Sequence, residues 1–247
     1  MKKILGGIAA ASLIMAGSAF AGGHAHWGYT GDVGPSHWGD LDPAFHMCKE
    51  GKNQSPIDLK GFIEADLKPI QVSYETHPVE IVNNGHSIQV NVGVGGTLTI
   101  DGHTFALKQF HFHAPSENLI EGKSFPMEAH FVHADKAGNL AVIAVMFEIG
   151  KKNPVIEELW KNMPDHAGKK VSLAGSTLDP AALLPSDHDY YRFNGSLTTP
   201  PCSEGVWWIV MKKTVQVSKE QVEKFEHVMH HPNNRPVQPV NARPVLK

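Results

Sequence analysis

The chain has 247 residues, of which 41% are hydrophobic and 19% charged, enough to bury at least one sizeable core. Its formal net charge of -3 gives no sign of the basic surface that nucleic-acid binding requires, so we expect no nucleic-acid partner. After residue 21 the sequence contains no run of about 18 apolar residues, so we expect no membrane span in the mature protein. No break in composition divides residues 22–247, which we interpret as one domain.

Residues 1–21 have the three parts of a secretory signal peptide. Lys2 and Lys3 form a positive n-region, an apolar stretch covers residues 4–15, and Ala19-Phe20-Ala21 fits an A-x-A cleavage site. The sequence therefore predicts a secreted protein, and the style of the leader indicates the periplasm of a bacterium. An uncleaved membrane anchor is the alternative.

Cleavage after Ala21 would leave Gly22, Gly23 and His24 at a free amino end. An amine, two amide nitrogens and an imidazole can form the square-planar set that suits copper(II) or nickel(II). We state this as a hypothesis, and a tail that binds no metal is the alternative.

Short alternating runs, separated by turn residues, dominate the rest of the chain. Such runs cover residues 78–92, 97–113, 127–135, 140–149 and 205–217. Asp101-Gly102 is a strong hairpin signal, and the last run reads as one long strand. Many hairpins and few helices predict a mainly β, single-domain fold with one large, twisted, mostly antiparallel sheet and a few peripheral helices.

Two helices are expected. Asn153 can cap the first helix, with Pro154 at its first position. Ser218 and Gln221 fit a capping box for the second helix. Three histidines are expected to form only a solvated end of that helix: His227, His230 and His231.

The stretch QFHFH contains two histidines one residue apart. In a strand, residues i and i+2 share a face, so Gln109, His111 and His113 line one face. Phe110 and Phe112 then line the other face. One face therefore carries polar side chains that can converge on a common point, and the other carries apolar side chains suited to burial.

The strand MEAHFVHAD adds a third histidine by the same parity. Glu128 and His130 share one face, whereas His133 points away and should not be a ligand. If the two strands are neighbours, His111, His113 and His130 meet on one face. Three imidazoles with water in the fourth position are a known catalytic zinc set, and their neutrality leaves the full charge of the ion to activate that water. A polar strand face in solvent is the alternative.

Partners that could orient these rings precede two of the histidines. Gln109 and Glu128 lie two residues before His111 and His130, on the same faces. Metal-bound histidines usually donate their second ring N–H to a carboxylate or carbonyl.

Cys48 and Cys202 are the two cysteines of the chain. In an oxidising compartment an even pair predicts one disulfide, and two free buried thiols are the alternative.

With these motifs in order, the chain resembles the alpha-class carbonic anhydrases of the bacterial secreted type. The resemblance covers nearly all of residues 24–247 and is carried by HWGYTG, GKNQSPIDL, NNGHSIQV, QFHFHAPSEN, MEAHFVH, LAVIAVMF, NGSLTTPPCSEGVWWIV and NRPVQP. It implies a central twisted, mostly antiparallel sheet of about ten strands. It implies the reversible hydration of carbon dioxide to bicarbonate and a proton by a zinc hydroxide, one zinc per chain, and inhibition by sulfonamides. A monomer and a homodimer are both left open.

At matching positions the resemblance implies roles for single residues. His111, His113 and His130 would be the zinc ligands. Thr198 would accept a hydrogen bond from the zinc-bound hydroxide, and Glu117 would take the proton of Thr198. The resemblance also fits the predicted disulfide.

Further positions match the proton path and the substrate pocket. Thr199 would help to bind bicarbonate, His86 would shuttle the proton as an imidazole titrating near pH 6.5, and Tyr29 would order a chain of water. The apolar wall for carbon dioxide would be Val132, Val142, Leu197, Val206 and Trp208. Without the resemblance, a solvated turn would be expected for His86 and ordinary core for the wall.

Two other functions compete with carbon dioxide hydration. A carbonic-anhydrase-like binding module that has lost catalysis would usually lack a zinc histidine, and all three are present here. A zinc esterase would use the same nucleophile, as a side activity, but the narrow apolar wall disfavours a large ester.

Overall fold

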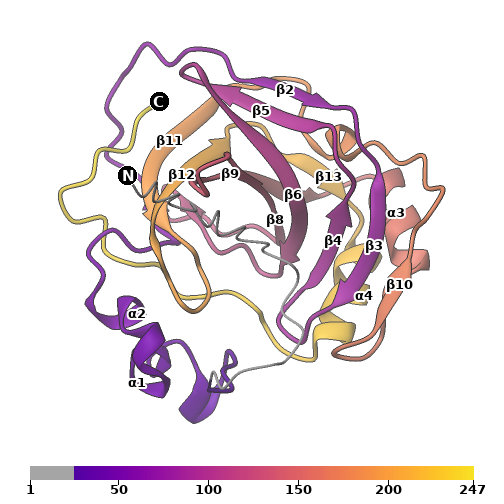
Figure 1. Ribbon diagram of the computed structural model, residues 1–247, viewed down its shortest axis with the longest axis horizontal. Helices are drawn as coiled ribbons and strands as arrows, with labels where there is room; N and C mark the ends of the chain where they lie inside the picture. Colours follow the sequence, from indigo (N-terminus) through magenta and orange to yellow (C-terminus); the bar gives the residue numbers. More distant parts are fainter. Residues whose placement is uncertain (1–24) are drawn as a thin grey trace, which may run out of the picture.

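The computed structural model describes residues 25–247, and it is mainly β (Figure 1). The expected signal peptide and the hypothetical copper site at Gly22, Gly23 and His24 lie outside the described residues. Within the described part of the chain, no helix is both long and apolar enough to cross a membrane.

One sheet of 11 strands dominates the molecule. Along its main path the order is β10-β3-β4-β6-β8-β9-β12-β11; β5 joins β6 to β2, and β13 pairs with β9. The strands of this sheet are β2 (Gln71–Tyr74), β3 (Pro78–Asn83), β4 (Ile88–Val92), β5 (Gly96–Ile100), β6 (His103–His113), β8 (Met127–Ala134), β9 (Leu140–Ile149), β10 (Lys170–Ser172), β11 (Tyr190–Ser196), β12 (Glu204–Met211) and β13 (Val215–Val217). Two short strands form a separate parallel pair: β1 (Asp58–Leu59) and β7 (Leu119–Ile120).

The sheet is mostly antiparallel, as predicted. Among the described strands of the large sheet, the parallel pairs are β12 with β9 and β13 with β9. A turn between Asn83 and Ile88 joins β3 to β4, and the predicted hairpin turn at Asp101-Gly102 joins β5 to β6. Asp101 and Gly102 both have positive φ, which is the geometry that a tight two-residue turn requires.

The single long strand predicted for residues 205–217 is wrong, because the structure divides it into β12 and β13. Both strands pair with β9, where Val210 lies opposite Ala144 and Val215 lies opposite Phe147. Val210 and Val215 are five residues apart in the sequence, whereas their partners on β9, Ala144 and Phe147, are only three residues apart. Two residues are therefore left over, and the chain leaves the sheet between β12 and β13.

Helices lie at the periphery, as expected: α1 (Trp38–Leu41), α2 (Met47–Glu50), α3 (Pro154–Lys161) and α4 (Lys219–Met229), with three-residue or four-residue 3-10 turns η1 (Gly31–Val33), η2 (Pro43–Phe45) and η3 (Pro180–Leu183). In Figure 1, α1 and α2 lie on the opposite side of the molecule from α3 and β10. The Asn153 side chain accepts hydrogen bonds from two backbone N–H groups at the start of α3, and Ser218 and Gln221 form the predicted capping box of α4.

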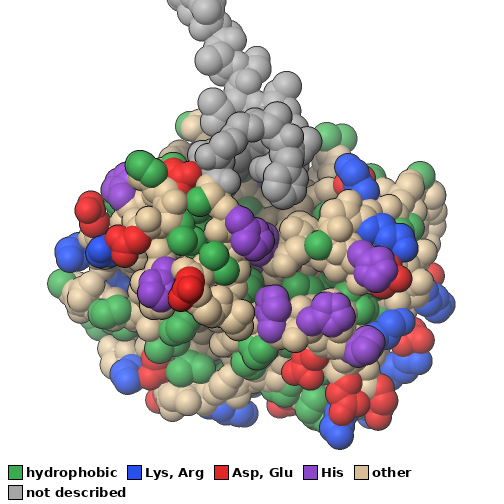
Figure 2. Space-filling model, turned by 90° about the horizontal axis from the view of Figure 1, so that it is seen from below, with side chains coloured by type: hydrophobic (Ala, Val, Ile, Leu, Met, Phe, Trp, Pro, Cys, Tyr) green, Lys and Arg blue, Asp and Glu red, His purple; other side chains and the backbone are tan. Residues whose placement is uncertain are grey.

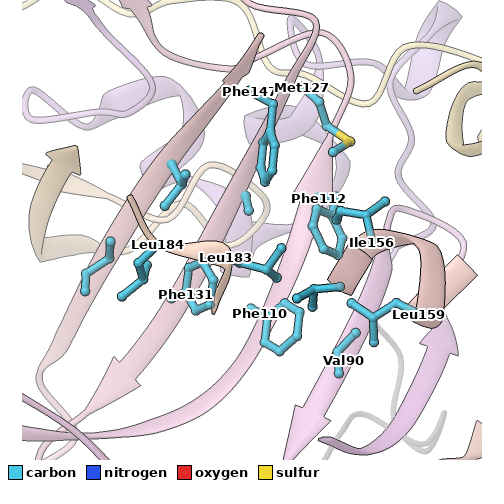
Figure 3. Packing of buried hydrophobic residues seen from close by; sticks show 14 of the residues in the cluster. Val90, Phe110, Phe112, Met127, Phe131, Phe147, Ile156, Leu159, Leu183 and Leu184 are labelled. Atoms are coloured by element: carbon cyan, nitrogen blue, oxygen red, sulfur yellow. The ribbon is translucent and has the colours of Figure 1, made fainter. Parts of the chain in front are cut away.

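The main hydrophobic core covers one face of the sheet. Phe110 and Phe112 of β6 and Phe131 of β8 pack there with Ile156 and Leu159 of α3 (Figure 3). Each fully buried Phe stabilises the fold by roughly 1.5–3 kcal/mol. This core fixes which face β6 and β8 turn to the helices, and therefore which side chains they present on the other face.

Candidate metal centre

Three histidines converge on the face of the sheet that is turned away from the helices. β6 and β8 are antiparallel neighbours, and their register places His111 directly opposite His130. His113 lies two residues along β6 on the same face. One ring nitrogen from each of the three residues lies within 4.8 Å of the other two. Strand parity and register together produce the cluster, as the sequence predicted.

Each histidine ring is oriented by a hydrogen bond from the ring nitrogen that points away from the centre of the cluster. His111 Nδ1 donates to Gln109 Oε1 (2.8 Å), and His130 Nε2 donates to Glu128 Oε1 (2.8 Å). Both partners are those expected from the sequence. These bonds fix the tautomers, so His111 Nε2 and His130 Nδ1 carry the lone pairs that face the centre.

The orienting partner of the third ring was missed by sequence reasoning. His113 Nδ1 donates to the backbone carbonyl of Asn233 at 2.7 Å, 120 residues further along the chain. The Asn233 side chain also accepts from Ala114 N and donates to the carbonyl of Phe112, which fixes this segment against β6. No local sequence signal marks a backbone carbonyl as a partner, and only the motif NRPVQP nearby drew attention to the region.

The residues of the triad fit a zinc ion. His113 Nε2 is buried without a hydrogen-bond partner, although buried polar atoms are almost always satisfied. Burial lowers the pKa of His111 and of His130 well below the usual range, and burial also lowers the pKa of His113. Three neutral imidazoles with inward lone pairs are a donor set that zinc prefers.

Glu128 is held in place by a dense set of hydrogen bonds. Its carboxylate accepts from Glu117 N (2.7 Å), Asn118 N (2.9 Å) and Asn118 Nδ2 (2.8 Å), besides His130. The Glu128 carboxylate therefore accepts four hydrogen bonds and cannot rotate without losing several of them. Because the carboxylate is fixed, it fixes the ring of His130 in turn.

Glu117 lies between the triad and the threonine loop. Its Oε2 is 3.4 Å from His113 Nε2 and 3.8 Å from His130 Nδ1, while its Oε1 accepts from the backbone N–H of Arg235 (2.9 Å). Burial raises the pKa of Glu117 to about 8, against the lowering effect of hydrogen bonds from Arg235 and from the Thr198 side chain. Glu117 and the Thr198 side chain are thus neighbours, and the proton transfer that the resemblance implied between them stays a prediction.

Arg235 is a second residue of this region that the sequence did not single out. It is 2% exposed, and its guanidinium donates to Gln54 Oε1 (2.9 Å), to the Ser55 carbonyl (2.8 Å) and to the Cys48 carbonyl (3.0 Å). Arg235 thus connects the segment that contacts Glu117 with the segment that carries the disulfide.

The predicted disulfide between Cys48 and Cys202 is present. Cys202 N donates to the carbonyl of Thr199 at 2.9 Å, so the bridge closes the turn that follows Thr198. Thr199 is half-buried beside this turn.

The five residues of the expected apolar wall lie together on the same face as the triad. Val142, Val206 and Trp208 belong to a second hydrophobic cluster, and Val132 and Leu197 pack against it. The ring of Trp208 meets that of His130 edge-on, with 4.9 Å between ring centroids. The wall is therefore contiguous with the histidines.

His133 lies on the opposite face, as strand parity predicted. Its Nε2 accepts from the Tyr74 hydroxyl at 2.7 Å, and its Nδ1 donates to the Ala141 carbonyl at 3.2 Å. The ring is fully buried.

His86 and Tyr29 lie beside each other at the outer edge of the site. The ring centroids of these two residues are 6.5 Å apart, and the ring of Trp27 stacks on His86. Burial lowers the pKa of His86 to about 4, so the ordinary value near 6.5 expected from the sequence is wrong for this structure. The Tyr29 hydroxyl is buried without a hydrogen-bond partner among the described residues, and burial raises the pKa of Tyr29 well above its usual range, with the charge of Glu117 as the second cause.

The fold and the site define an enzyme class in which a β-sheet presents three histidines to a metal beside an apolar wall. The family model of eukaryotic-type carbonic anhydrases matches residues 33–247. A carbonic anhydrase of Pectobacterium atrosepticum is 49% identical over 229 residues, which are 93% of each chain. One of Neisseria gonorrhoeae is 50% identical over 242 residues, covering 96% of this chain and 95% of the other.

A solved structure extends the likeness to three dimensions. The alpha-carbonic anhydrase from Thermovibrio ammonificans, in complex with the inhibitor sulfanilamide, is 56% identical with a TM-score of 0.89. The match covers 91% of this chain and 100% of that one. The chain therefore belongs to the eukaryotic-type, or alpha, carbonic anhydrase family of enzymes, as its motifs predicted.

Proposed function

We propose that the protein catalyses the reversible hydration of carbon dioxide to bicarbonate and a proton. The observation that carries this proposal is the convergence of His111, His113 and His130 beside an apolar wall, each ring oriented through its other nitrogen. Membership of the carbonic anhydrase family supports the same reaction.

His111 Nε2, His113 Nε2 and His130 Nδ1 would hold one zinc ion per chain. Zinc bound by three neutral imidazoles supplies a water of lowered pKa, and thus a nucleophile at neutral pH. Gln109, Glu128 and the Asn233 carbonyl keep the three lone pairs aimed at one point. This preorganisation reduces the entropy cost of binding the metal.

Thr198 and Glu117 would orient the nucleophile. Glu117 accepts from Arg235 N and lies close enough to the Thr198 side chain to act on it; a proton passed from Thr198 to Glu117 would leave the threonine oxygen as an acceptor toward the centre of the site. An acceptor at that point selects one orientation of the attacking group and so raises the rate by positioning. Thr199, in the turn closed by the disulfide, would bind bicarbonate.

The apolar wall would hold carbon dioxide next to the triad. A small nonpolar substrate gains from contact with Val142 and Trp208, whereas charged bicarbonate gains nothing there and leaves. An apolar wall of this kind suits a small nonpolar substrate better than a large ester, and the complete triad with Glu117 and Thr198 disfavours an inactive binding module. Neither alternative is favoured by an observation of its own.

The proton released in hydration would leave past Tyr29 and His86, at the outer edge of the site. The leader assigned to residues 1–21 and the disulfide together support secretion into an oxidising compartment such as the bacterial periplasm. Residues 22–247 would form the mature catalytic domain.

A matched pair of histidine variants tests the proposal. We expect His130→Ala to lose both bound zinc and carbon dioxide hydration, because its lone pair faces the centre. His133→Gln removes a histidine three residues along β8 on the other face and should keep both. Zinc is measured by metal analysis and hydration by stopped flow with a pH indicator. Full zinc occupancy in His130→Ala, or loss of zinc in a folded His133→Gln, would show that the triad is not the metal site.

A further inference from the structure

A second imidazole lies at the same edge of the site as His86. The ring of Tyr29 is flanked by His86, with 6.5 Å between ring centroids, and by His231, with 5.9 Å. His231 is half-buried, whereas His227 and His230 are exposed, as expected for a solvated helix end. Several histidine side chains lie on the face of the molecule that Figure 2 shows.

The chain places His231 there by a defined turn. α4 ends at Met229, and His230 caps it in the left-handed conformation, with φ 65°. The following segment is fixed through Asn233, whose Nδ2 donates to the His86 carbonyl at 3.0 Å and whose carbonyl accepts from His113 Nδ1. One residue thus connects the triad, the His86 turn and the segment that carries His231.

The tautomer of His231 suits it to accept a proton. Its Nδ1 lies 3.0 Å from the carbonyl of Pro232, which can only accept, so Nδ1 carries the hydrogen. Nε2 is then the basic nitrogen. Tyr29 contacts the ring of His231 and is near enough to Glu117 for that charge to raise the Tyr29 pKa, so His231 lies beside the same tyrosine as His86.

His86 is by itself a weak acceptor in this position. Its ring is stacked on Trp27 with centroids 3.6 Å apart and an angle of 7° between the planes. Burial, with positive charge on His26 and His231 as the smaller causes, lowers the pKa of His86 to about 4. At pH 7 such a group would be protonated in only about one molecule in a thousand.

We propose that His231 is a second proton-relay residue for the reaction, working in parallel with His86. Its Nε2 takes the proton released when water adds to carbon dioxide, through water beside Tyr29. The resulting imidazolium gives the proton to a base of the buffer and returns to the neutral ring, so no other reactant is consumed. This inference rests on the proposed function of the site.

Four variants separate the two routes: His231→Ala, His86→Ala, the double variant, and His227→Ala as a control that removes an exposed imidazole from α4. The maximal hydration rate is measured by stopped flow in dilute buffer, and the exchange of oxygen-18 between carbon dioxide and bicarbonate at chemical equilibrium is measured beside it. The double variant should lose on the order of tenfold more hydration rate than His86→Ala, with exchange unchanged. Added imidazole should restore most of that loss, and His227→Ala should match the wild type.

An NMR measurement tests the cluster without reference to activity. The ring C2–H resonances of the zinc-loaded protein are followed with pH, and His231→Ala should shift the titration of His86 upward, whereas His227→Ala should not. The inference is overturned if the double variant equals His86→Ala, if His231→Ala lowers exchange as much as hydration, or if the His86 titration does not move. If the wild type shows neither hydration nor exchange, the proposed function itself has failed.

Discussion

The buried pair of His133 and Tyr74 makes the fold sensitive to acid, and the structure gives the size of the effect. Both ring nitrogens of His133 are engaged, and Nε2 must stay unprotonated to accept from the Tyr74 hydroxyl. Burial lowers the pKa of His133 from 6.5 to about 4. Unfolding restores the ordinary value, so between these two values the unfolded chain binds one more proton than the folded chain.

The sign follows from that difference. The contribution of the neutral ring to stability is complete above pH 6.5 and is lost as the pH falls toward 4. A gap of this size corresponds to about 3 kcal/mol of unfolding free energy, since one pKa unit is about 1.4 kcal/mol. His133→Gln replaces the ring by an amide that can donate and accept but does not titrate.

The assay is urea unfolding of zinc-loaded wild type and His133→Gln between pH 7 and 4.5. The variant should be less stable at pH 7, and the difference between the two proteins should shrink by about 2 kcal/mol at pH 4.5. Loss of zinc at low pH affects both proteins, so the comparison isolates His133. A difference that stays constant across this range would refute the reasoning.

Three further predictions concern the supports of the site. Glu128→Gln should lower zinc affinity about 10- to 100-fold, measured by competition with a chelator, because the amide orients His130 less firmly; unchanged affinity would contradict this. Arg235→Met should lower the free energy of unfolding by about 3 kcal/mol, because two buried acceptors and one partly buried acceptor lose their donor, and an unchanged urea midpoint would count against it. Cys202→Ser should lower stability by several kcal/mol, on the order of 5 for a loop of this length, and also reduce hydration. An unaltered melting temperature would rule out a structural role for the bridge.

The central part of the site could be predicted because it is encoded locally. Parity along two strands puts His111 and His113 on one face and separates His130 from His133. The orienting roles of Gln109 and Glu128 follow from the same two-residue spacing. Hairpin signals and helix caps are equally local, which is why they matched the structure.

What could not be predicted depends on long-range contacts or on breaks in regularity. The Asn233 carbonyl and the guanidinium of Arg235 reach the site from the far end of the chain, and no local pattern marks them. A bulge between Leu107 and Gln109 shifts the register of β6. Before the bulge an odd-numbered residue, Leu107, faces the core, and after it an even-numbered residue, Phe110, does. Alternation counted back from QFHFH would therefore have assigned the first half of this strand to the wrong face.

The proton path shows the same limit. The resemblance to the family implied His86 as the relay, with the ordinary titration of an imidazole. The stack on Trp27 and the burial that lowers the pKa of His86 arise only when segments far apart in the chain meet. The approach of His231 to Tyr29 likewise depends on the turn after α4.

Stopped-flow hydration of carbon dioxide by the mature chain, before and after removal of its metal, tests the central claim most directly. The zinc-loaded protein should accelerate hydration far above the buffer rate, lose that activity when a chelator removes one zinc per chain, and recover it when one equivalent of zinc is returned. A well-folded, zinc-loaded protein that leaves the hydration rate at that of buffer alone would contradict the account.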